Sequence, residues 1–169
     1  MIDYLPIYFL LFIITGTILI FASHSDIKSR TIPLKYWYPI VYFVLPISFI
    51  PIIDHIWNGV ININDPMQSI PIIYTIFSIF VLIFIAYMGK IGCADVIAII
   101  SILIMVLPIN VNLPLTYLLL LIILSIIIII VWKLFNKKET IPYIIPISLS
   151  YFIMFILYFA YGFTAISLV

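Results

Sequence analysis

Short polar breaks divide this chain into long apolar segments, and this division limits its fold more than any other feature. The segments cover about residues 5–22, 36–53, 70–88, 96–107, 115–132 and 144–165. About 20 apolar residues in a helix cross the hydrocarbon core of a bilayer, and a helix satisfies its own backbone groups there. We therefore predict an all-α polytopic membrane protein, in which residues 1–169 form one domain with six transmembrane helices and short loops.

Composition excludes the main alternatives to a membrane protein. Hydrophobic residues make up 67% of the chain and charged residues 8%, too little polar surface to cover a soluble globule. A soluble enzyme, a nucleic-acid-binding protein and a disordered chain are thereby excluded. Cys93 is the single cysteine and cannot form an internal disulfide, and no Cys or His cluster has zinc spacing. We expect no metal, no cofactor and no nucleic-acid partner, and a lipid bilayer as the surroundings.

The basic residues are distributed unevenly over the loops. All seven lie in the first, third or fifth loop between the apolar segments, namely Lys28, Arg30, Lys35, Lys90, Lys133, Lys137 and Lys138. Cytoplasmic loops of membrane proteins carry an excess of Lys and Arg. The sequence therefore predicts a multi-pass protein of the cell membrane with its odd-numbered loops in the cytoplasm and both termini outside.

Two of the six acids are placed to form a site. Asp26 follows the first apolar segment and Asp95 precedes the fourth, so the hairpin of the second and third segments returns both to one membrane face. Residues 96–109 form a helix of about 21 Å, shorter than the roughly 30 Å hydrocarbon core. We therefore expect Asp95 at or slightly inside the inner boundary, where an acid is a candidate for function.

Carboxylates at one level can share a proton, because two like charges a few ångströms apart do not both ionise easily. One carboxyl group then acts as an acid, and the other acts as a base toward a bound water. The positive end of a helix dipole would favour the charged form of Asp95. Hydrolysis of a peptide bond is the natural reaction for such a pair.

Plainer interpretations of the same residues remain open at this point. Asp95 is also a favourable N-cap for the helix that follows, and Asp26 could be an ordinary interfacial charge. Lys28 and Arg30 could serve only to set the topology, and Glu139 has the setting of a solvated loop charge. A proton- or ion-coupled transporter would use paired acids as a relay, and a structural membrane subunit would not need them.

Two short motifs carry a family resemblance. Residues 26–33 have the pattern D-x-x-x-R-x-I-P, and residues 92–95 have the pattern G-x-A-D. At these two helix ends they resemble the type IV prepilin peptidase family, which includes the archaeal preflagellin peptidases. Members are six-span aspartic proteases of the G-x-G-D type. The resemblance implies that Asp26 and Asp95 are the catalytic pair.

The resemblance also assigns supporting roles. Gly92 corresponds to the first glycine of G-x-G-D, and Ala94 replaces the second. Arg30 and Pro33 belong to the first motif. Lys28 and Arg30 are possible substrate contacts. These assignments would place the motif residues around the two aspartates.

The family further implies a substrate and a location. Its substrates are pilin-like or archaellin-like precursors, whose short basic leader precedes an apolar helix and is removed at the cytoplasmic face. This chain departs from the family at Leu34, where Asn is common, and at Ile97, where Lys is common. The cysteine-rich cytoplasmic segment of the bacterial methylating members has no counterpart, so the resemblance implies an aspartic endopeptidase without methyltransferase activity, closer to the archaeal members.

Overall fold

A computed structural model describes residues 4–29, 32–59, 61, 64–88, 92–135 and 144–166. The structure is 87% helical, and the described residues form no strand, which confirms the prediction of an all-α chain. The α-helices are α1 (Leu5–Ser29), α2 (Leu45–Trp57), α3 (Pro66–Tyr87), α4 (Cys93–Val106), α5 (Leu113–Phe135) and α6 (Ile144–Ile166). A 3-10 turn at Leu34–Tyr36 and a π-helix at Ile40–Val44 precede α2.

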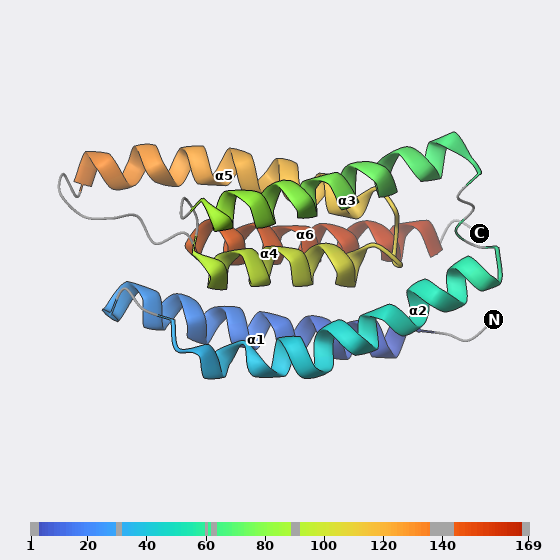
Figure 1. The fold of residues 1–169 in the computed structure, drawn as a ribbon, viewed down its shortest axis with the longest axis horizontal. Coiled ribbons are helices and arrows are strands. Elements are labelled where there is room, and N and C mark those ends of the chain that lie inside the picture. Colours follow the sequence, from blue (N-terminus) through green and yellow to red (C-terminus); the bar gives the residue numbers. More distant parts are fainter. Residues whose placement is uncertain are drawn as a thin grey trace.

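Successive helices run in alternate directions along the long axis of the bundle (Figure 1). Helices α1, α3 and α5 end at the left of this view, and α4 and α6 begin there. The end of α1 and the start of α4, which carry the two aspartates predicted to pair, therefore lie at the same end of the molecule.

Four helical stretches among the described residues have the length and apolar composition of a membrane span. They lie at Pro6–Lys28, Ile40–Trp57, Pro66–Tyr87 and Leu113–Leu134. The apolar stretches at Cys93–Val106 and Ile144–Leu157 are shorter. A membrane protein with several helical spans is thus supported, whereas six spans remain a prediction.

Helix α4 is the shortest α-helix but one and lies at the centre of the bundle. It contacts α2, α3, α5 and α6, and eight of its residues are buried. Because protein rather than lipid surrounds α4, its length does not have to match the bilayer thickness. It begins further inside the bundle than the end of α1 or α5 (Figure 1), and Asp95 in its first turn is partly buried.

The second apolar segment contains prolines and is not a regular α-helix throughout. Proline has no N–H to donate and its ring clashes with the carbonyl four residues before it. Before Pro46 the hydrogen-bond ladder changes register, because the N–H of Leu45 bonds to the carbonyl of Ile40 and forms the π-turn. The segment predicted at residues 36–53 is therefore not one α-helix, and α2 starts only at residue 45.

Two further boundaries differ from the predicted segments. Helix α1 continues seven residues beyond Ala22, so Asp26 lies within the helix rather than after it. Helix α3 begins at Pro66 instead of residue 70, because the Asp65 side chain accepts a hydrogen bond from the N–H of Met67 at 3.0 Å. Such a cap, followed by proline at the first helical position, is a common helix start.

Polar contacts inside the apolar bundle fix α1 against α6. The hydroxyls of Ser23 and Ser148 lie 2.7 Å apart, one turn before Asp26. Toward the opposite end, the Tyr151 hydroxyl donates to the carbonyl of Phe12 at 2.6 Å. Hydrogen bonds between membrane helices are worth about 0.6–2 kcal/mol each. The pair at Ser23 therefore helps to hold Asp26 at a fixed place beside the bundle.

Candidate active site

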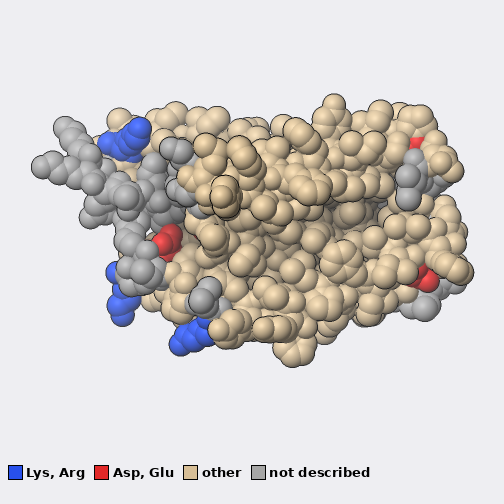
Figure 2. Space-filling model, in the orientation of Figure 1, with Lys and Arg blue, Asp and Glu red and all other residues tan. Residues whose placement is uncertain are grey.

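Charge lies only at the two ends of the described molecule. Figure 2 shows Lys and Arg side chains at one end, acids at both ends and uncharged surface between them. The described basic residues are Lys28, Lys35 and Lys133, and we call their end of the bundle the basic end. Asp54 and Asp65 lie at the opposite end.

Asp95 lies in the first turn of α4 at the basic end. The residue that caps this helix is Gly92, with φ −64° and ψ 139°, so the interpretation of Asp95 as the N-cap is wrong. The helix starts three residues earlier than predicted, which places Asp95 at its third position. From there its carboxylate accepts a hydrogen bond from the backbone N–H of Gly92, as the acidic member of a capping box does.

Gly92 is in close contact with this carboxylate. A Cβ atom added at Gly92 would lie 3.0 Å from Oδ2 of Asp95. The backbone at Gly92 has an ordinary negative φ, so glycine is needed here for space rather than for conformation. Any larger side chain would displace the Asp95 carboxylate or rotate it away from its hydrogen bond.

The structure brings Asp26 and Asp95 together. Asp95 lies outside the four helical stretches that are long and apolar enough to cross a membrane. Burial and, to a smaller extent, the nearby negative charge of Asp26 together raise its pKa from 3.8 to about 6, while the Gly92 N–H acts in the opposite direction. These are the effects expected for two carboxylates in partly dehydrated surroundings.

The remaining residues of the two motifs have different surroundings. Ala94 is partly buried against the core of the bundle. Pro33 is exposed, and its carbonyl accepts the N–H of Tyr36 at 3.1 Å, which starts the 3-10 turn. Lys28 is exposed in the last turn of α1, and Arg30 lies outside the described residues.

The described part of the chain holds no cluster of metal-binding side chains. No three His, Cys, Asp or Glu side chains there gather closely enough to hold an ion. Cys93 is exposed two residues before Asp95 and has a free thiol. It offers a native position for chemical labels beside the candidate site.

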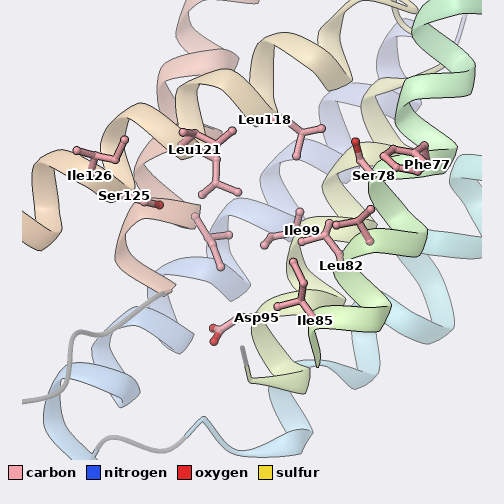
Figure 3. A pocket seen from close by; sticks show the side chains of 13 residues that line it. Phe77, Ser78, Leu82, Ile85, Asp95, Ile99, Leu118, Leu121, Ser125 and Ile126 are labelled. Atoms are coloured by element: carbon pink, nitrogen blue, oxygen red, sulfur yellow. The ribbon is translucent and has the colours of Figure 1, made fainter. Parts of the chain in front are cut away.

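An apolar cavity of about 470 Å³ extends from Asp95 toward the middle of the bundle. In Figure 3, Asp95 lies at one end of the lining residues, while Phe77 and Leu118 lie at the other. Ser78 of α3 and Ser125 of α5 are the small polar residues of this lining. These two serines were not predicted as part of the site, although isolated serines in apolar segments are a signal for helix contacts in membranes.

Comparison of the chain with protein-family models, curated proteins and solved structures finds no match. The resemblance to the prepilin peptidases therefore depends on the two motifs alone. What the chain adds to them is the geometry of its own residues: two aspartates at one end, a glycine in contact with one of them, and an apolar cavity that begins there.

Proposed function

We propose that this chain is a membrane-embedded aspartic endopeptidase that removes the basic leader from pilin-like or archaellin-like precursors. In this proposal the six helices cross the cell membrane, both termini lie outside, and the basic end faces the cytoplasm. The charge distribution supports this orientation, because the described basic side chains lie at the end that holds Asp26 and Asp95.

The closeness of Asp26 and Asp95 carries the proposal. They come from helices separated by the whole hairpin of the second and third apolar segments, and yet Asp26 acts electrostatically on Asp95. Asp95 is partly buried, at the start of a helix that lies inside the bundle. Removing a carboxylate from water is unfavourable, so a pair of acids in such a place is more readily explained by a function than by folding.

A pair of this kind can hydrolyse a peptide bond in a balanced set of steps. The ionised carboxylate takes a proton from water as the water oxygen attacks the scissile carbonyl carbon. The protonated carboxyl group gives its proton to the carbonyl oxygen, which forms a neutral tetrahedral intermediate. The carboxyl group that took the water proton then gives it to the leaving nitrogen, and the C–N bond breaks. The other carboxylate takes a proton from one hydroxyl of the intermediate, which forms the new carboxyl group and restores the pair. One proton shared by two carboxyl groups supplies both roles.

The distribution of charge does not favour a proton- or ion-coupled transporter. Transporters place their ionisable residues near the middle of the bilayer. Apart from Asp3, which precedes the first apolar segment, every Asp, Glu, Lys and Arg of this chain lies in or beside a break between the apolar segments. The middle of each helix carries hydroxyl side chains but no Asp, Glu, Lys or Arg. It therefore lacks the charged side chains of a proton relay across the bilayer.

The test is a cleavage assay with the purified protein in liposomes. Precursors of a type IV pilin and of an archaellin are supplied in the same membranes, and the new N-terminus is sequenced. We expect Asp26→Asn to lower the cleavage rate about 10²–10⁴-fold, the usual contribution of an acid or base. Asp54→Asn, at the opposite end, is the matched control and should retain the rate. No cleavage of either precursor by the wild-type protein would refute the proposal.

A further inference from the structure

The cavity beside Asp95 opens toward the outer surface of the bundle. Its walls come mainly from α3, α4 and α5, and several wall residues also face outward. Phe77 of α3 is 63% exposed, and Ile122 and Ile126 of α5 are 57% and 53% exposed. In a membrane these side chains contact lipid. A molecule within the bilayer can therefore contact the wall of the cavity without passing through water.

The lining combines a long apolar wall with one charged end. Asp95 is the charged residue among those that line the cavity. Ser78 and Ser125 are small, and small residues let another helix approach closely in a membrane. The volume of about 470 Å³ lies within the range of about 300–1,000 Å³ that is usual for binding sites.

Charge distinguishes a peptide helix from a lipid as the occupant. Lys28, Lys35 and Lys133 belong to the same end of the bundle, but they are not among the residues that line the cavity, whose charged group is Asp95. An anionic lipid in the cavity would place its phosphate beside the Asp95 carboxylate and near Asp26, where like charges repel. An apolar helix preceded by basic residues would place positive charge there instead. The two serines and the exposed apolar side chains then face its helical part.

We propose that the cavity between α3 and α5 is the docking site for the first apolar helix of the substrate. This inference rests on the proposed peptidase function and adds the surface that positions the scissile bond. The helix enters sideways from the bilayer, and its leader junction lies at Asp95.

The extent of the cavity sets how much of the substrate is bound. From Phe77 to Ile85, α3 lines it over a span of nine residues, which is roughly 12 Å or a little more than two helical turns. A docked helix therefore contacts the enzyme with about the first two turns after the cleavage site. Bulky or charged substitutions in those turns should slow cleavage, and substitutions further along the substrate helix should not.

A second cavity supplies a matched control within the same protein. It measures about 630 Å³, is also apolar, and lies between α2, α3 and α4 toward the opposite end. Ser69 lines it as Ser125 lines the cavity beside Asp95. Ser125→Phe and Ser69→Phe therefore place the same side chain in two similar cavities, of which only one begins at the candidate site.

The experiment compares the two variants on two substrates. With a full-length precursor that the wild-type protein cleaves, Ser125→Phe should lower kcat/KM at least tenfold through a higher KM, and Ser69→Phe should change it less than twofold. With a soluble peptide that spans the cleavage site but lacks the apolar helix, both variants should match the wild type. This second substrate shows that Ser125→Phe has kept its fold and its catalytic pair.

Crosslinking identifies the occupant directly. In a Cys93→Ser background, a photoreactive group attached at Ser125→Cys should capture the precursor within the first two turns of its apolar helix. The same group at Ser69→Cys should not. Capture of phospholipid alone at position 125, or an equal effect of both phenylalanine variants on the precursor, would overturn the docking site and leave the peptidase function standing. Absence of cleavage by the wild-type protein would overturn both.

Discussion

Replacing Asp95 with asparagine should make the folded protein more stable at neutral pH, although it removes a residue with a proposed catalytic role. Asparagine keeps the size of the side chain and an oxygen that can accept the hydrogen bond from Gly92. It removes the charge that burial and Asp26 make unfavourable. The variant should therefore gain stability while it loses activity, a common relation at active sites.

The size of this gain follows from the pKa of Asp95. The pKa is about 6 in the folded protein and 3.8 in an ordinary environment, and each pKa unit corresponds to about 1.4 kcal/mol. Because the carboxylate is partly exposed, water screens some of the effect, and we expect a gain of about 1–3 kcal/mol. The unfolded chain releases this proton at lower pH than the folded chain, so the stability of the wild type falls as the pH rises from about 4 to 6.

Thermal unfolding in detergent between pH 3.5 and 8 measures this difference. The curves of wild type and Asp95→Asn should meet near pH 3.5, separate up to pH 6 and stay apart above it. Asp54 accepts a hydrogen bond from Asn58 at the opposite end, and Asp54→Asn is the control that should bring no gain. A loss of stability in Asp95→Asn at pH 7 would show that Asp95 is a structural residue and would refute this reasoning.

Three further predictions test the site. Gly92→Ala should lower the cleavage rate at least tenfold with little change in melting temperature, because its methyl group would lie 3.0 Å from Asp95 Oδ2. The control Gly16→Ala, whose methyl group would lie 3.3 Å from Tyr151 and Phe152, should mainly lower the melting temperature. The reverse pattern would exclude a role for Gly92 in the site. The cleavage rate should fall as the pH rises through about 6, because the pair of aspartates loses its shared proton. It should also be low at acidic pH, where both carboxyl groups are protonated. A rate that rises steadily from pH 5 to 8 would contradict a shared proton. A membrane-impermeant maleimide should label Cys93, which is exposed, only after intact cells are opened. In a Cys93→Ser background, a cysteine placed at position 58 should instead react in intact cells. The opposite result would reverse the proposed topology.

The helices could be predicted from the sequence because each apolar segment has the length and uniformity of a buried or lipid-facing helix. The continuation of α1 from Ser23 to Ser29 was harder to predict, because this stretch is polar by composition. The structure keeps it helical, and there Ser23 contacts Ser148, 125 residues further along the chain. Such a contact leaves no local pattern in the sequence.

The pairing of Asp26 with Asp95 could be predicted from the alternation of the helices, which returns both to one end. The central place of α4 could not, because all the apolar segments have similar composition and only packing distinguishes the buried one. The cavity beside Asp95 depends on the faces that α3, α4 and α5 turn toward one another. Nothing local to Ser78 or Ser125 specifies that they line the same space.

Cooperation between Asp26 and Asp95 is the central claim, and a double-mutant cycle on the cleavage of one precursor tests it most directly. Two groups that act as a unit lose their whole effect when either is removed. We predict that Asp26→Asn, Asp95→Asn and the double variant all fall to the same residual rate. Rates that multiply independently, or a single variant that retains most of the wild-type rate, would contradict a shared catalytic pair.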